Sequence, residues 1–284
     1  MPGLFPSIFD YETLYTAYTQ INREKLYQNE ARSFAANLEE NLISIQNDLI
    51  YKSYEIGCYN THKIKGTYQY AVLPFRDKVV QTAVYNVLNP FFMRSYICES
   101  YGLPIEERYR AAANHLRDFL NVLKKEPKAY YFQKLTIPNY HLQIDHTVLI
   151  ELLQRRIACR GVRWLLKKIV NSEDDALGLP LGTSARKAGW RDNKISLMLA
   201  DIYLNALDNY AIRDLRIKYY VRFLDEIIIL SNSVDVINYL VYTMEAFIQE
   251  KLRLILDAST EIHSIEYTRP SLSKLNIRRH RRKY

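Results

Sequence analysis

The sequence predicts an α+β fold, with helices and short strands in the first half and an antiparallel sheet backed by helices in the second half. Two observations lead to this prediction. In the first half, apolar residues such as Phe34, Leu38 and Leu42 recur at helical spacing. In the second half, the patterns give the order strand, three helices, two strands, helix, strand, and the two consecutive strands form a predicted hairpin.

The elements of the first half follow from hydrophobic periodicity and from glycine punctuation. Ile45 and Leu49 continue the helical spacing that begins at Phe34, whereas Gly57 and Gly66 interrupt an alternating, aromatic-rich stretch. We therefore expect a helix over residues 30–50, short strands over 54–73, and helices over 76–88 and 105–124.

The elements of the second half surround two nearly all-apolar runs with acidic residues between them. Such runs, rich in β-branched and aromatic residues and separated by a short polar segment, are typical of a hairpin. The expected elements are a strand ending at Ile137, helices over about 145–158, 160–171 and 195–215, a hairpin of Lys218–Phe223 and Ile227–Leu230, a helix over 234–251 and a strand over 253–257.

Charge is unevenly distributed along the chain. The 284 residues are 48% hydrophobic, enough for a sizeable core, and carry a formal net charge of +8. Six Lys or Arg residues lie in the last eleven positions, and subtracting six from +8 leaves +2 for the rest. This basic tail is either a phosphate-binding segment or a solvated end, and composition leaves both readings open.

Other composition features exclude several protein classes. Cys58, Cys98 and Cys159 are odd in number, far apart and without a CxxC spacing, so neither a disulfide framework nor a zinc site is predicted. We see no signal-peptide pattern and no apolar run of about 20 residues, so no membrane partner is expected and a cytoplasmic location is the default.

Asp225 and Glu226 form the sharpest local feature, because they separate two apolar strands. Acidic residues are common in turns for purely structural reasons. A catalytic role would require a further carboxylate on a neighbouring strand. Two divalent cations about 4 Å apart, which clamp the attacking and leaving oxygens, take acidic ligands from more than one segment.

A resemblance to a known family rests on an ordered set of segments over about residues 30–265. These segments are Asn37–Leu42, Leu73–Gln81, Ile144–His146 followed by Leu149–Ile157, Gly178–Gly182, Ala200–Asp208 and Tyr220–Glu226. Together they resemble the bacterial reverse transcriptases of group II introns and diversity-generating retroelements.

The resemblance implies a right-hand architecture and a polymerase activity. It implies a fingers-like region over residues 1–128, a palm-like region over 129–267, and a basic tail or thumb stub over 268–284. It further implies RNA-directed DNA polymerase chemistry with Mg²⁺, RNA or DNA as partner, and a retroelement or antiphage defence setting. An active reverse transcriptase or an accessory protein is a possible further partner.

Several positions depart from the family's catalytic pattern. The family's hairpin is an aromatic residue, any residue and two aspartates, so Asp225 matches the first metal-binding aspartate and Glu226 replaces the second. The other essential aspartate belongs at Thr136, which is neutral and a poor Mg²⁺ ligand. Asp145 matches a different family position and is expected to cap a helix.

The nucleotide-binding positions also depart from the family. Tyr68 stands where the resemblance implies an arginine, Glu99 replaces a second arginine, and Leu197 replaces a glutamine that touches the nucleotide. We therefore expect a pseudo-polymerase or scaffold that binds nucleic acid. The alternative is an active polymerase with an unorthodox metal site, in which Glu99, Glu106 or Glu107 supplies the missing carboxylate.

Basic residues in three regions are candidates for nucleic-acid contact. The alternative is that most of them are solvated surface, with Arg76 pairing with Asp77 at a helix start. The candidates are Arg76, Lys78, Arg186, Lys187, Arg191, Lys194, Arg278, Arg279, Arg281, Arg282 and Lys283.

Overall fold

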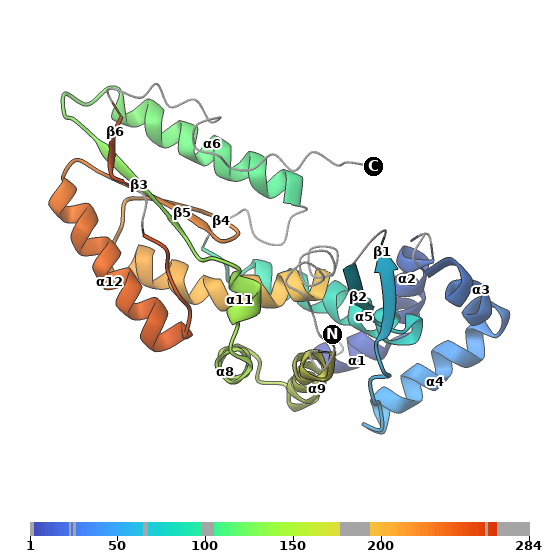
Figure 1. The fold of residues 1–284 in the computed structure, drawn as a ribbon. Coiled ribbons are helices and arrows are strands. Elements are labelled where there is room, and N and C mark those ends of the chain that lie inside the picture. The colour runs from blue at the N-terminus through green and yellow to red at the C-terminus, as the bar shows by residue number, and fades with distance from the viewer. Residues whose placement is uncertain are drawn as a thin grey trace. The chain divides into compact units, whose positions relative to one another are not determined.

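The computed structural model describes residues 3–22, 24, 27–64, 68–97, 105–176, 194–258 and 261–265 (Figure 1). These residues form two compact units, each made of two stretches of chain. Unit 1 lies within residues 1–94 and 149–202, and unit 2 within residues 95–148 and 203–284. The structure combines many helices with a two-stranded and a four-stranded antiparallel sheet, which confirms the predicted α+β class.

Unit 1 is mainly helical. Apolar residues of α5, among them Val79, Val80 and Val84, are fully buried and pack against α1 and α2. β1 and β2 pair in an antiparallel ribbon. The elements are α1 (Leu4–Phe9), α2 (Tyr11–Ile21), α3 (Gln28–Ala36), α4 (Leu38–Ile50), β1 (Asn60–Ile64), β2 (Tyr68–Val72), α5 (Phe75–Met93) and α9 (Arg160–Ala176).

The single helix predicted over residues 30–50 is wrong, because the structure divides it at Asn37. The backbone of Asn37 leaves the helical region, with φ −130° and ψ 50°. The side-chain amide of Asn41 donates to the carbonyl of Phe34 at 3.0 Å, and this contact satisfies an acceptor that a continuous helix would use internally. The apolar spacing continues across the break, so periodicity alone could not reveal it.

The start of α5 is held by one carboxylate from α3 and by one of its own. Glu30 of α3 accepts a hydrogen bond from the Phe75 backbone N–H at 3.0 Å. Asp77 is 2% exposed and accepts from the Tyr54 hydroxyl at 2.7 Å and from the Gly57 backbone N–H at 2.9 Å. Burial beside Asp77 raises the pKa of Tyr54 above its ordinary value. The bond to Glu30 satisfies a backbone donor at the start of the helix, and the two bonds to Asp77 satisfy its buried carboxylate.

Unit 2 contains the four-stranded sheet, whose strands follow the order β4-β5-β3-β6 and are all antiparallel. Its elements are α6 (Ile105–Leu123), β3 (Tyr131–Thr136), α7 (Tyr140–Gln143), the π-helical turn η2 (Tyr210–Asp214), β4 (Tyr219–Phe223), β5 (Glu226–Ser231), α12 (Val234–Leu252) and β6 (His263–Ser264). Two further helices, α8 (His146–Arg156) and α11 (Lys194–Asn209), contribute residues to both units.

The strand predicted over residues 253–257 is also wrong, because it reduces to a single bridge between Asp257 and Thr136. The backbone N–H of Leu254 bonds instead to the carbonyl of Ile248 at the end of α12. The N–H of Ile255 bonds to the Gln143 side chain at 2.8 Å. Backbone donors that satisfy a helix end and a side chain cannot also extend the sheet.

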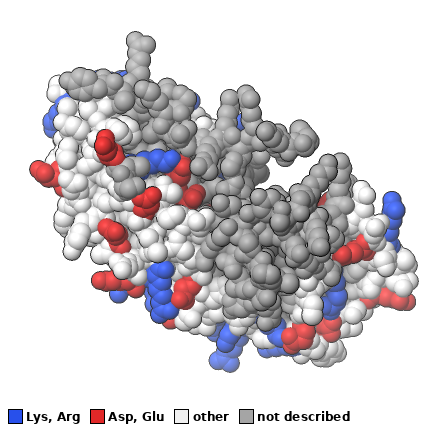
Figure 2. All heavy atoms as spheres, viewed as in Figure 1, with Lys and Arg blue, Asp and Glu red and all other residues white. Residues whose placement is uncertain are grey.

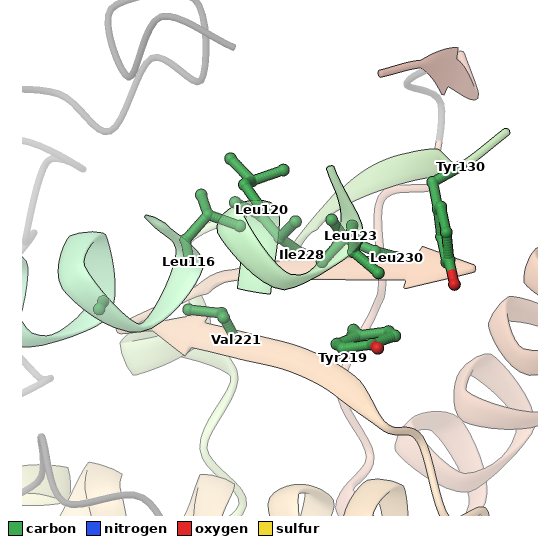
Figure 3. Close-up of a cluster of buried hydrophobic side chains, with 9 residues drawn as sticks. Leu116, Leu120, Leu123, Tyr130, Tyr219, Val221, Ile228 and Leu230 are labelled. Atoms are coloured by element: carbon green, nitrogen blue, oxygen red, sulfur yellow. The ribbon is translucent and has the colours of Figure 1, made fainter. Parts of the chain in front are cut away.

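Helices cover both faces of the sheet in unit 2 (Figure 1). On one face, α6 lays an apolar stripe across β4 and β5 (Figure 3). The buried residues of this cluster are Ala112, Leu116, Leu120, Leu123, Tyr130, Tyr219, Val221, Ile228 and Leu230. On the other face, α12 contacts β5 and β3, and the C-terminal part of α11 reaches β4 through Asp208.

Within the described residues, no helix combines the length and the hydropathy that a membrane span requires.

Candidate functional site at the β4–β5 hairpin

The hairpin joins β4 and β5 through only Leu224 and Asp225, since Phe223 and Glu226 are already paired. Leu224 has φ 53°, a left-handed conformation that is uncommon for a residue with a branched side chain. The guanidinium of Arg222 donates to the Leu224 carbonyl at 2.6 Å. This bond stabilises the unusual turn and so restricts the position of Asp225, the next residue.

A buried ion pair anchors that guanidinium. Arg222 Nε and Nη2 donate to Asp208 Oδ1 and Oδ2, each at 2.8 Å, and both side chains are fully buried. The Tyr220 hydroxyl adds a third bond to Asp208 at 2.7 Å. The pair is bidentate, so it fixes direction as well as distance between α11 and β4.

The end of β3 lies directly beside this turn. Thr136 is paired with Glu226 across β3 and β5, and the backbone N–H of Ile137 donates to the Asp225 carbonyl at 2.9 Å. On the other side, Thr136 bridges Asp257 through two backbone hydrogen bonds. Residues opposite each other in antiparallel strands share a face. Asp257, Thr136 and Glu226 therefore form one row, on the face that α6 covers.

Glu226 is neutralised by a lysine of the neighbouring strand. Lys134 Nζ lies 2.7 Å from Glu226 Oε1, and each of the two side chains is 19% exposed. Lys134 precedes Thr136 by two positions and so lies on the same face. An ammonium group thus occupies the space beside a carboxylate that a metal-binding hairpin would present to a cation.

The donor set at the hairpin does not fit a two-metal centre. Such a centre takes carboxylates from more than one segment, but the strand beside Asp225 and Glu226 presents the hydroxyl of Thr136. Across the part of the chain that the structure describes, no three His, Cys, Asp or Glu side chains are grouped so that they could hold a metal ion.

The described residues among the predicted nucleotide-binding positions and alternative carboxylates lie in three different elements. Tyr68 lies in β2, and Leu197 is a buried residue of α11. Glu107 is exposed on α6, and Glu106 precedes it in the same helix. Glu99 lies outside the described residues. The alternative carboxylates for an unorthodox metal site therefore stay predictions.

Arg76 and Lys78 lie on the first turns of α5. Arg76 forms an ion pair with Asp48, lies 3.7 Å from Asp77 and stacks 5.3 Å from the centre of the Tyr54 ring. This agrees with the alternative that Arg76 is a surface residue paired with an acid at the start of a helix. Lys78 is half-buried in the same helix.

Lys194 begins α11, where its ammonium lies 5.8 Å from the centre of the Tyr85 ring. The remaining basic candidates lie outside the described residues and stay predictions. They are Arg186, Lys187, Arg191, Arg278, Arg279, Arg281, Arg282 and Lys283.

Asp145 caps α8, which confirms the prediction from sequence. Its Oδ1 accepts from the Val148 backbone N–H at 3.0 Å, and its Oδ2 lies 2.7 Å from Arg253 Nη1. The hydrogen bond from Val148, and then the Arg253 guanidinium, hold the pKa of the Asp145 carboxyl below its usual value. The nearby Tyr203 donates to the Leu252 carbonyl at 2.5 Å, and burial raises its pKa to about 12.

Sequence reasoning missed three contacts that shape this site. The partnership of Lys134 with Glu226 could have been suspected, because strand alternation places Lys134 on the face of Thr136. The bridge to Asp257 and the pairing of Asp208 with Arg222 depend on how distant segments meet, and no local pattern encodes them.

Comparison with family models and with curated proteins finds no match to this chain.

Proposed function

We propose that this chain is a reverse-transcriptase-like protein that binds nucleic acid and acts as a pseudo-polymerase or scaffold, with little or no nucleotidyl transfer. One observation carries the proposal. Glu226 pairs with Thr136 on the neighbouring strand and forms an ion pair with Lys134. The resemblance expects an aspartate at the position of Thr136.

The physical reason lies in what phosphoryl transfer requires. Catalysis of this reaction is almost entirely positioning and electrostatic stabilisation, and metal cations supply most of the stabilisation. Thr136 brings no charge to the centre, and the Lys134 ammonium competes with a metal for Glu226. Removing one such electrostatic group typically costs a factor of about 10² to 10³ in rate.

The surrounding architecture supports a palm-like role for unit 2. A hairpin that ends in acidic residues lies beside a third antiparallel strand, and helices back the sheet. The bidentate pair of Asp208 and Arg222 joins two of the segments on which the resemblance rests, Ala200–Asp208 and Tyr220–Glu226. In a retroelement or antiphage setting, such a protein would hold RNA or DNA for an active reverse transcriptase or an accessory protein.

The decisive test is nucleotide incorporation on a primed RNA template with Mg²⁺ or Mn²⁺. We expect no incorporation by the parent protein. Thr136→Asp in combination with Lys134→Gln should create a carboxylate pair without a competing ammonium and produce a measurable gain. Thr136→Asn with Lys134→Gln is the matched control, because it has nearly the same shape without the charge. Clear incorporation by the parent that Asp225→Ala abolishes would contradict the proposal.

A second candidate is an active RNA-directed DNA polymerase with an unorthodox Mg²⁺ site. It would require Asp257 as the further carboxylate, because this residue pairs with Thr136 in the same row as Glu226, although the side chains of the described residues do not group three metal ligands there. Within the same assay, Asp257→Asn distinguishes the two functions. Parental incorporation that Asp257→Asn abolishes would establish the second candidate and overturn the first.

A further inference from the structure

The segment around α9 is strongly cationic, although sequence analysis did not select it. Residues 152–172 contain no Asp or Glu. Their basic residues are Arg155, Arg156, Arg160, Arg163, Lys167 and Lys168. On the face drawn in Figure 2, basic and acidic side chains of the described residues are interspersed. The run spans the end of α8 and the first three turns of α9, and the acidic residues of α9 (Glu173, Asp174 and Asp175) all lie at its C-terminal end.

Helical geometry gathers three of these cations on the outer side of α9. Arg160, Arg163 and Lys167 are spaced at i, i+3 and i+7, which places them along one stripe of about 10 Å. We call these three residues the α9 stripe. The opposite side of the helix is buried through Val162, Leu165, Leu166, Ile169 and Val170.

Contacts with α1 fix the rotation of α9. A side chain at Gly161 would lie 2.4 Å from the Phe5 ring, so only glycine permits this close approach. Trp164 packs edge-to-face on Phe5, with ring centres 6.2 Å apart. The buried side therefore cannot turn outward, and the stripe stays at the surface.

The stripe differs from the neighbouring cations in its ion pairing. Arg155 has Glu151 at 3.9 Å, and Lys168 pairs with Glu55. Among the described residues, by contrast, Arg160, Arg163 and Lys167 form no ion pair. Cations without acidic neighbours retain their full attraction for a polyanion.

We propose that the α9 stripe binds the phosphate backbone of a nucleic acid. The inference rests on the proposed function, since it names the surface through which this protein would hold RNA or DNA. Arg and Lys suit phosphate oxygens, and a stripe of about 10 Å spans more than one phosphate along a strand. A membrane surface is a poorer partner, because membrane-surface helices insert a free apolar face, whereas the apolar side of α9 is already buried in unit 1.

The test compares two triple variants that lose the same charge. The stripe variant is Arg160→Gln, Arg163→Gln and Lys167→Gln. The control is Lys124→Gln, Lys125→Gln and Lys128→Gln, all exposed residues at and after the end of α6. Binding of a fluorescent single-stranded RNA and of a primed RNA template is measured by anisotropy over a series of KCl concentrations, after thermal melting has confirmed that both variants fold.

The stripe variant should bind about tenfold or more weakly, and its slope of log affinity against log salt should fall by about 2 to 3. The control should stay within about twofold of the parent. If the parent binds RNA and the stripe variant binds equally well, or if the control loses as much affinity as the stripe variant, the proposed role of the stripe is wrong. Nucleic-acid binding by the protein would still stand. A parent that binds neither RNA at low salt overturns both the stripe and the proposed function. A stripe variant that loses binding to phosphatidylserine vesicles but not to RNA also overturns the stripe.

Discussion

At the scale of single residues, the most consequential contact is the buried pair of Arg222 and Asp208. It lies between helix and strand and determines where the Leu224 carbonyl, and hence the whole turn, can lie. Burying two charges is costly, and the attraction between them offsets that cost only when the geometry is good. The contribution of such a pair to net stability is therefore small, whereas the penalty for removing one partner is large.

Arg222→Met is expected to destabilise the protein by about 3 to 5 kcal/mol, because it leaves Asp208 charged and unpaired in the core. Urea denaturation followed by circular dichroism measures the change. The matched control is Arg253→Met, which breaks a pair whose side chains are 61% and 25% exposed and should cost at most about 1 kcal/mol. Equal losses in the two variants would show that the buried pair has no special role.

Asp145 is expected to make the free energy of unfolding depend on pH. Its folded-state pKa is lowered, so the stability it contributes is present above the unfolded-state pKa, near 4, and is lost as the pH falls through the folded-state value. Asp145→Asn retains the capping oxygen but removes the charge. We expect it to lower the free energy of unfolding by about 0.5 to 1 kcal/mol at pH 7. The difference from the parent should shrink below pH ~4, and a difference independent of pH would contradict this account.

At the scale of elements, α6 holds the sheet of unit 2 from one side. Its stripe of leucines meets β4 and β5 (Figure 3). The ring of Tyr109, near the start of α6, lies edge-to-face with the ring of Phe223, and the ring centres are 5.8 Å apart. This helix therefore supports the hairpin through its apolar packing rather than through polar contacts with the acidic turn.

Leu116→Ala should cost about 2 to 5 kcal/mol, since Leu116 is 1% exposed and its loss leaves a cavity against the sheet. Val122→Ala on the same helix is the control. Val122 is 49% exposed, and its substitution should change stability by less than about 0.5 kcal/mol. Chemical denaturation of both variants tests whether α6 is a structural part of unit 2. A cost below about 1 kcal/mol for Leu116→Ala would show that the helix packs loosely.

At the scale of the whole molecule, the two units are each made of two separate stretches of chain. Composition does not reveal this, because the sequence has few glycines and prolines and no linker-like segment between the stretches. The net charge of +8 is likewise a property of the whole chain that sequence supplies. Which cations face outward without acidic neighbours, as in the α9 stripe, depends on how each helix is rotated against its unit.

The sequence by itself determined the α+β class, most of the helices, the hairpin that carries Asp225 and Glu226, and the cap at Asp145. These features follow from local periodicity, turn residues and capping chemistry, which act over a few neighbouring positions. Only the tertiary structure decided the break at Asn37, the bridge of Thr136 to Asp257, and the pairing of Glu226 with Lys134 and of Arg222 with Asp208. Apart from the break at Asn37, these features join separate segments of the chain, and they form because buried charges and backbone donors need partners wherever the packed elements supply them.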